Sequence, residues 1–341
     1  MKNCNIFIIA ILILFYSFNC INGQDNFNKV AQSGMQYLKI GVDAAIVGKG
    51  EAGISTVTGL SSMFWNPAGL SGIDNYEVMF SHNAWIADIS MNTAAVGINV
   101  DNVGVFGLSV LWMDYGVLYK TSVATSIEES AALGYVDEGT FSPIDMAISL
   151  AYSKKISEQF SVGGQVRFLY EDYGTNETIS LTGDISSTKN RMTAFCFDLG
   201  TIYNTGFKSL AFSMTIQNFS PDLRYQYEAF STPLTFKIGA SMNLLDFVDN
   251  TSRSKVMLAV DAIHPRDYSE RLNVGLEYDH LGIFQLRGGY RMNYDEGNYT
   301  AGAGLKYSIS NNVGVRLDMS YLILSSGRFS SPFQLTAGVY F

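Results

Sequence analysis

The sequence predicts an all-β fold: a transmembrane antiparallel β-barrel of about 14 strands with an N-terminal hatch. Aromatic residues make up 13% of the 341 residues and charged residues only 16%, a balance typical of lipid-facing barrels. From Tyr76 onward, segments of about ten residues alternate apolar and polar side chains. The chain also ends on such a segment, whose last residue is the aromatic Phe341.

Residues 1–23 are predicted to be a secretory signal peptide. Lys2 supplies the positive start, residues 6–15 form an apolar run, and Gly23 is a small residue suited to cleavage. Cleavage there would leave Cys196 as a lone cysteine, so we expect no internal disulfide.

Residues 24–75 are predicted to form the hatch, because they show no sustained period-2 pattern. Residues 44–53 are a run rich in alanine and glycine, and such small residues suit a segment packed tightly inside another structure. Residues 76–341 are then the barrel itself.

The predicted strands are clearest at 233–244, where Leu234, Phe236 and Ile238 lie on one face and Thr235 and Lys237 on the other. The full set of ranges is 76–84, 90–100, 103–112, 142–153, 160–173, 192–203, 209–218, 233–244, 254–263, 270–279, 283–292, 299–307, 313–321 and 333–341.

The connections between these strands alternate in length. Short connections such as 101–102 and 154–159 occupy periplasmic positions, whereas the long ones, 113–141, 174–191 and 219–232, occupy outer positions. Because hydrocarbon satisfies no backbone N–H or C=O, strands in a membrane must close into a barrel. The lipid bilayer of a Gram-negative outer membrane is therefore the expected environment.

The last strand ends in a pattern that barrel-insertion machinery recognises in barrels that this chain resembles. Phe333, Leu335, Ala337 and Val339 share one face with Phe341. Phe341 is therefore the candidate insertion signal, and the insertion machinery is an expected partner.

Charged residues in the second half of the barrel lie on the face opposite the apolar one. They are Asp261, Arg271, Glu277, Arg287, Arg291, Lys306, Arg316 and Asp318. In a barrel this face lines the lumen, where opposite charges can pair. A structural ion-pair network is the favoured interpretation, and a solute-selective patch is the alternative.

No enzymatic, metal or cofactor site is predicted. Residues 48–53 fit G-x-G-x-x-G, but antiparallel hairpins rather than a βαβ unit follow them. His82, His264 and His280 are scattered without metal-ligand spacing. The net charge of -9 argues against nucleic acid as a partner.

Two blocks resemble a known family. Residues 65–70, Trp-Asn-Pro-Ala-Gly-Leu, and residues 37–41 resemble the N-terminal region of PorV/PorQ-type proteins, relatives of the FadL long-chain fatty-acid transporters. Residues 261–264, 270–278 and 286–291 resemble the C-terminal half of that family. The resemblance implies a 14-stranded barrel plugged by an N-terminal hatch. Residues 44–45 and 47–50 depart from the family's hatch pattern.

The resemblance implies a component of type IX-like protein secretion, with secretion-system subunits and secreted cargo as partners. The alternative is FadL-like passive uptake of hydrophobic molecules such as long-chain fatty acids. A third interpretation is a structural barrel with an adhesive loop at 113–141.

The Trp-Asn-Pro-Ala-Gly motif is the candidate gate of the hatch. Pro67 fixes its own φ and bars Asn66 from helical geometry, so the chain turns there. Gly69 permits a second bend beside Ala68, and Trp65 offers a large anchor against the inner wall. The alternative is an ordinary turn before the first strand.

Overall fold

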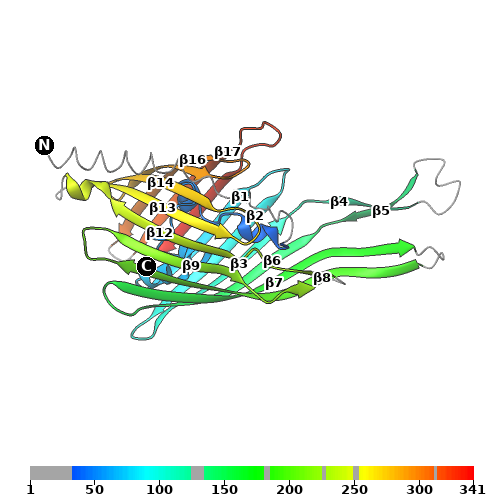
Figure 1. Cartoon of the computed structure of the whole chain (residues 1–341), viewed down its shortest axis with the longest axis horizontal. Helices are drawn as coiled ribbons and strands as arrows, with labels where there is room; N and C mark the ends of the chain where they lie inside the picture. Colours follow the sequence, from blue (N-terminus) through cyan, green and yellow to red (C-terminus); the bar gives the residue numbers. More distant parts are fainter. Residues whose placement is uncertain (1–32, 124–133, 180–184, 225–227, 249–252, 311–312) are drawn as a thin grey trace.

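The computed structural model describes residues 33–123, 134–179, 185–224, 228–248, 253–310 and 313–341. Over these ranges, 14 strands form a closed antiparallel barrel, drawn in Figure 1. The first and last barrel strands pair from Glu77↔Tyr340 to Ala84↔Phe333 and close the cylinder. The predicted fold class is confirmed.

Every predicted barrel strand overlaps one in the structure. The barrel strands are β1 (Tyr76–Ala84), β2 (Ser90–Val100), β3 (Gly104–Asp114), β6 (Ile144–Lys155), β7 (Phe160–Ile179), β8 (Ile185–Asn204), β9 (Ala211–Phe219), β12 (Thr235–Asn243), β13 (Lys255–Pro265), β14 (Arg271–His280), β15 (Phe284–Met292), β16 (Tyr299–Ser310), β17 (Val313–Ile323) and β18 (Phe333–Tyr340).

Three predicted outer loops contain strands that the sequence pattern did not predict. β7 and β8 stay paired beyond a bulge, from Thr175↔Lys189 to Ile179↔Ile185. A separate hairpin, β4 (Leu118–Val123) and β5 (Tyr135–Phe141), occupies the loop 113–141. Both project from the barrel at its long-loop end (Figure 1). Strands outside the bilayer need no apolar face, so the alternating signal is lost there. A shorter pair, β10 (Leu223–Arg224) and β11 (Ala229–Phe230), lies in the next long loop.

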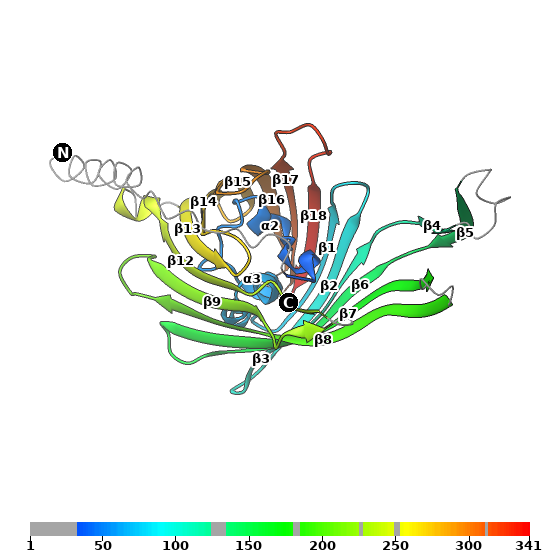
Figure 2. The same ribbon diagram turned by 45° about the vertical axis from the view of Figure 1, so that its right-hand side comes forward.

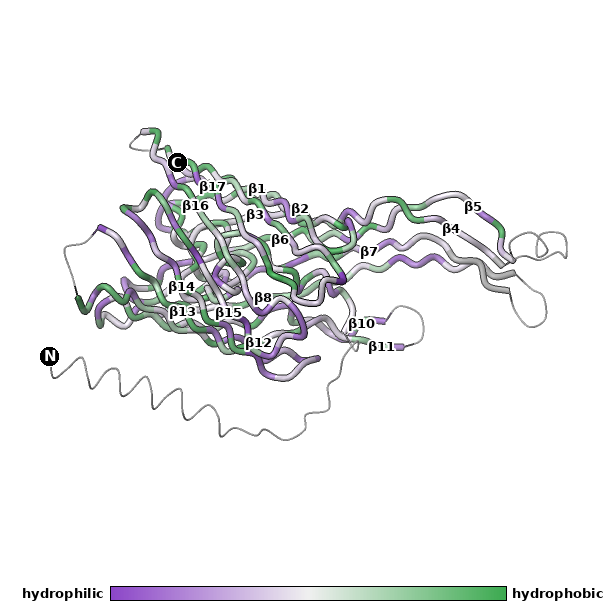
Figure 3. Tube along the Cα trace, turned by 90° about the horizontal axis from the view of Figure 1, so that it is seen from above, coloured by the Kyte–Doolittle hydropathy of each residue, from purple (hydrophilic) through white to green (hydrophobic). Residues whose placement is uncertain are grey.

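The barrel is apolar outside and polar inside, as the alternation predicts. Outward side chains such as Phe80, Leu150 and Leu199 are 48%, 60% and 63% exposed to the surroundings. Their neighbours Ser81 and Ser149 are buried in the lumen. In Figure 3, hydrophobic and hydrophilic residues are interspersed along the barrel strands. No helix in the described ranges is long and apolar enough to cross a membrane.

The plug, residues 33–75, lies inside the barrel (Figure 2). It consists of short helical turns: η2 (Gln36–Lys39), α2 (Ala44–Val47), η3 (Gly59–Ser61), α3 (Ser62–Trp65) and η4 (Pro67–Gly72). Of the predicted hatch, residues 24–32 lie outside the described residues, as does the predicted signal peptide.

The plug packs against parts of the wall that carry small residues. Leu60 and Met63 are fully buried in a cluster with Ala95 and Ala151 of the wall. A Cβ at Gly97 or Gly107 would collide with these plug side chains. Small wall residues thus give the apolar plug the room to fill the lumen.

Candidate functional site

The Trp-Asn-Pro-Ala-Gly motif is the part of the plug that packs against the β7–β8 wall. The Asn66 side chain is fully buried, accepts a hydrogen bond from Ala68 N (3.2 Å), and donates to Ile54 O (2.9 Å) and Thr201 O (3.1 Å). Pro67 lies against the backbones of Gly163 and Gly200, where a Cβ would leave it no space. The structure therefore places the motif in firm contact with β7 and β8.

Trp65 anchors the motif on its other side. The Trp65 ring is buried and its Nε1 donates to Val42 O at 2.6 Å. The backbone carbonyls of Phe64 and Trp65 each accept a 2.9 Å bond from Gln217 of β9. Gly69 is buried where a Cβ would meet the Val57 carbonyl. Whether the motif moves stays a prediction.

Above the motif, at the long-loop end, lies a cavity of about 440 Å³, here called the outer cavity. Its apolar and aromatic lining includes Phe64, Trp65, Trp85, Leu111 and Met113. A volume of this size is within the range of small-ligand sites.

The charged lining of the outer cavity is strongly biased to cations. Among the described residues it contains Lys39, Arg167, Lys237, Arg271 and Arg291 and a single acid, Glu51. The bias makes the cavity attractive to an anion.

Three of these cations are paired with carboxylates. Arg167 contacts Asp198 at 2.5 Å, and Arg291 contacts Glu51 at 3.2 Å. Lys39 pairs with Asp267.

The Lys39–Asp267 pair joins the plug to an outer loop. Lys39 ends η2 of the plug, and Asp267 lies in the loop between β13 and β14. Burial opposes ionisation of Asp267, but hydrogen bonds from Lys39 and Ser33 outweigh it and hold the pKa of Asp267 below its usual range. Burial lowers the pKa of Lys39, and the contact with Asp267 offsets only part of that effect. The ionised form of Asp267 therefore stabilises the contact between this outer loop and the first turn of the plug.

The other two cations have no carboxylate within ion-pair distance in the described ranges. Lys237 is only 9% exposed, and its ammonium lies 4.9 Å from the centroid of the Trp65 ring. The Arg271 guanidinium lies over the rings of Tyr268 and Tyr294, at 4.5 and 4.1 Å from their centroids, and its Nε has no hydrogen-bond partner. Lys237 is thus buried and Arg271 half-buried, and burying a cation without a close ion pair is unfavourable.

A second, polar cavity of about 240 Å³, the inner cavity, lies at the short-turn end beside Tyr76 and Phe341. A charge cluster forms its wall. Arg287 contacts Glu277 at 2.5 Å and Asp318 at 2.6 Å. Arg316 contacts Asp318 at 3.5 Å.

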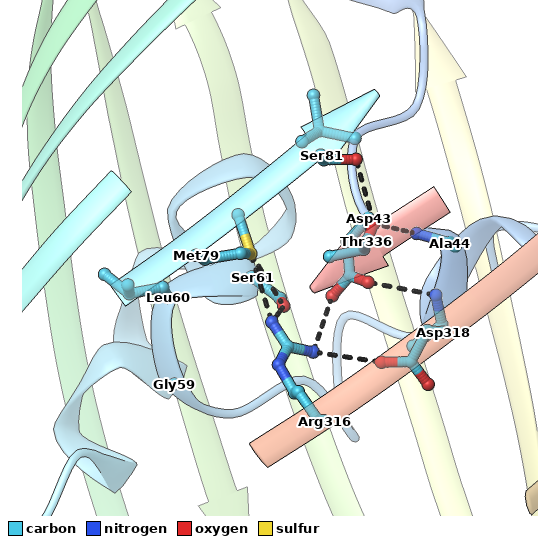
Figure 4. Close-up of polar contacts among 12 residues, drawn as sticks. Asp43, Ala44, Gly59, Leu60, Ser61, Met79, Ser81, Arg316, Asp318 and Thr336 are labelled. Atoms are coloured by element: carbon cyan, nitrogen blue, oxygen red, sulfur yellow. Dashed lines mark hydrogen bonds and ion pairs between the residues drawn. The ribbon is translucent and has the colours of Figure 1, made fainter. Parts of the chain in front are cut away.

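Arg316 also joins the wall to the plug (Figure 4). Its Nη1 lies 3.3 Å from Asp43, and its Nη2 donates to Ser61 Oγ at 2.7 Å. The Glu77 carboxylate lies 3.8 Å from its Nε. Such a network of buried charges is costly unless each member is paired.

The structure divides the predicted lumen network. Glu277, Arg287, Arg316 and Asp318 form one cluster. Arg291 pairs with the plug, and Arg271 lies on aromatic rings. Asp261 accepts bonds from Gly53 N (2.7 Å) and Ile54 N (3.0 Å).

The sequence analysis missed the plug partners Asp43, Lys49 and Glu51 and the wall residues Lys237, Arg167 and Asp198. The three wall residues fall on inward positions of the predicted strands, so the face assignment contained their signal. The plug residues carried none, because the plug has no regular period.

Phe341 lies on the outward face and is 43% exposed, and its N–H bonds to Tyr76 O at 2.8 Å. Its role as an insertion signal remains a prediction. Cys196 is a buried free thiol. Within the described ranges, no group of three or more His, Cys, Asp or Glu residues could hold a metal ion.

No family model and no curated protein matches the sequence. Solved structures do resemble the fold. The Ralstonia pickettii toluene transporter TbuX is 14% identical, with a TM-score of 0.58 over 88% of this chain and 97% of that chain. The Pseudomonas putida toluene transporter TodX is 12% identical, with a TM-score of 0.56 over 88% and 97%.

A Pseudomonas aeruginosa FadL homologue is 12% identical, with a TM-score of 0.54 over 88% of this chain and 98% of that chain. The chain therefore has the fold of FadL-like transport barrels. Its place is the outer membrane, where single-chain barrels with an apolar exterior reside.

Proposed function

We propose that this protein is a passive uptake channel for hydrophobic molecules that carry an anionic head, such as long-chain fatty acids. The observation that carries the proposal is the outer cavity. One part of its lining is aromatic and aliphatic, and another part holds Lys237 and Arg271, which form no ion pair within the described ranges.

The charge of the cavity favours this class over neutral hydrocarbons. An apolar tail gains by contact with Phe64, Trp85 and Leu111 whether or not it carries a head. Only a carboxylate also pairs with the buried Lys237 and the half-buried Arg271, which offsets the cost of their removal from water. A neutral hydrocarbon would leave that cost in place.

Tryptophan quenching tests the proposal. Trp65 and Trp85 line the cavity, whereas Trp112 lies on the outward side of β3. In a Trp112→Phe background reconstituted in lipid, dibromostearate should quench the two cavity tryptophans at saturable, low concentration. Its methyl ester should bind more weakly, because it brings no charge.

Lys237→Met removes the ammonium but keeps the stem. Loss of a charged contact worth about 1.5–3 kcal/mol should weaken acid binding by about tenfold or more and leave methyl-ester binding unchanged. Lys306→Met is the matched control, since Lys306 lines the inner cavity. Equal binding of acid and ester to all three proteins would refute the proposal.

The second candidate is the secretion role that the resemblance to PorV/PorQ-type proteins implies. Its support is the β4–β5 and β7–β8 hairpins, which extend the long-loop end as a surface for exported cargo; Tyr119 on β4 is 79% exposed. The solved structures described above include no secretion component, so uptake has the broader support. Deletion of the gene should leave secreted proteins in the periplasm under this candidate, and normal secretion would exclude it.

A further inference from the structure

Two carboxylic acids oppose one another on the inward face of β6 and β7. Asp145 and Glu171 are direct cross-strand partners in the antiparallel ladder, and they are only 1% and 4% exposed. Directly opposed side chains of two antiparallel strands have Cβ atoms about 4.5–5.5 Å apart. The two carboxyl groups are therefore close enough to interact.

The pair lies at the outer end of the β6–β7 ladder. Pairing of β6 with β7 ends one residue farther on, at Ile144, and β7 then continues into the projecting β7–β8 hairpin (Figure 1). The next strands on either side present methionines: Met113 of β3 is opposite Asp145, and Met192 of β8 is opposite Glu171. Both methionines are buried, so the acids have apolar neighbours on each side.

No cation balances the two acids. Neither acid forms an ion pair within the described ranges, and no basic side chain is among the groups that interact with them there. Arg167 lies on the same inward face of β7, but it is bound to Asp198 at 2.5 Å. Burial of an unpaired carboxylate is costly, and like charges directly opposed on neighbouring strands are destabilising. Two ionised acids at this position would oppose folding.

The polar groups that face the pair are uncharged hydroxyls and a thiol. Tyr115, which follows β3, donates a hydrogen bond to Asp145 Oδ2. The Tyr173 hydroxyl of β7 interacts with both carboxyl groups. Tyr37 of η2 in the plug interacts with both acids and with Cys196 of β8. These groups can donate hydrogen bonds to the pair, but none of them brings a positive charge.

One oxygen of the pair has no partner. Asp145 Oδ2 accepts the bond from Tyr115, whereas Asp145 Oδ1 is buried and takes part in no hydrogen bond. An ionised carboxylate is only an acceptor, so an ionised Glu171 has nothing to donate to that oxygen. A protonated carboxyl group is a donor as well. The unpartnered oxygen thus indicates that a proton belongs between the two acids.

We propose that Asp145 and Glu171 form a proton-binding site, in which one proton is shared between the two carboxyl groups. The proton removes one of two opposed charges and gives Asp145 Oδ1 its donor. Tyr115 and Tyr173 stabilise the charge that remains. Within the described ranges, no group of three or more His, Cys, Asp or Glu residues could hold a metal ion, so a proton is the cation that fits.

The site links the pH of the outer medium to the stability of this part of the wall. When the outer end of β6–β7 opens, the two acids meet water, where a carboxyl group loses its proton above about pH 4. Opening therefore releases the shared proton and becomes easier as the pH rises, until the closed site is itself deprotonated. Tyr37 and Tyr115 line the outer cavity, so the change reaches the wall of that cavity.

Infrared spectroscopy of the full chain in lipid tests for the shared proton. The C=O stretch of a protonated carboxyl group is resolved from that of carboxylates, and isotope labelling of glutamate or aspartate assigns it. The parent should show a protonated-carboxyl band at neutral pH that disappears in alkali. Glu171→Gln and Asp145→Asn should each abolish that band. Asp172→Asn is the matched control and should retain it, because Asp172 is bound to Arg191 at 2.6 Å.

Hydrogen exchange measures the consequence for stability. After correction for the intrinsic pH dependence of exchange, protection of amides 144–148 and 168–172 should fall about tenfold per pH unit above about pH 4 in the parent. Glu171→Gln should show no such slope, because its amide donates to Asp145 without titrating. Asp172→Asn should keep the slope of the parent. Heat resistance of the barrel in each variant shows that the fold is intact.

Three results would overturn the proposal. The first is a parent spectrum without a protonated-carboxyl band that depends on Glu171 or Asp145. The second is a Glu171→Gln variant with the same slope of protection as the parent. The third is a change in either measurement on addition of a chelator, which would show that the site holds a metal ion instead. None of these measurements involves a transported ligand, so their outcome is independent of the proposed uptake function.

Discussion

Replacing Asn66 with alanine removes three hydrogen bonds from the interior of the plug. The amide of Asn66 joins the plug carbonyl of Ile54 to the β8 carbonyl of Thr201 and caps η4 through Ala68 N. The side chain is fully buried, so water does not replace the lost partners.

The expected loss follows from these three contacts. Removal of a helix cap costs about 0.5–2 kcal/mol. Each carbonyl oxygen that loses its donor adds about 1 kcal/mol, the net contribution of a typical intramolecular hydrogen bond. The local stability of the plug should fall by about 2–4 kcal/mol.

Hydrogen exchange of residues 53–70 measures this local opening in the folded barrel. The amides should exchange about thirtyfold to a thousandfold faster, since each 1.4 kcal/mol is a factor of ten. Asn99→Ala is the control: Asn99 donates one exposed 3.0 Å bond to Asp74 O, and its loss should cost less than about 0.5 kcal/mol.

Asn66→Asp provides the refuting result. The carboxylate keeps the acceptor for Ala68 N but turns an oxygen toward the carbonyls of Ile54 and Thr201. If the donor bonds hold the motif, Asn66→Asp is at least as destabilising as Asn66→Ala. A clearly more stable aspartate variant would show that the cap bond alone matters.

Three further predictions concern other parts of the molecule. A Cβ on Gly200 would meet Asn66, so Gly200→Ala should cost about 1–3 kcal/mol in chemical unfolding, whereas Gly288→Ala, with nothing within 4 Å, should cost almost nothing; equal losses would contradict the close fit. The pKa of Asp267 is held below its unfolded value of about 3.9, so its stabilisation is complete above that pH and is lost as the pH falls through the lower folded value. Hydrogen exchange of the first plug turn should therefore rise below about pH 4 in the parent, and an Asp267→Asn variant should lack that step. Phe341→Ala should slow assembly of heat-resistant barrel in cells without altering the stability of barrel already assembled, and unchanged assembly would remove Phe341 as an insertion signal.

The sequence by itself determined the barrel. Alternation such as Leu234, Phe236 and Ile238 against Thr235 and Lys237 is a local property of extended backbone, and each strand carries it independently. The same alternation placed Arg287 and Asp318 in the lumen. The β7–β8 extension escaped prediction because strands outside lipid need no apolar face.

Only the tertiary structure decided what the plug meets. Glu51 pairs with Arg291 and Asp43 with Arg316 across separations of 240 and 273 residues. Gly163 and Gly200 are ordinary strand glycines in the sequence, yet they give Asn66 and Pro67 their space. These contacts depend on how the barrel closes around an irregular segment. Period and propensity describe neighbours along the chain, and they contain no information about partners across the lumen.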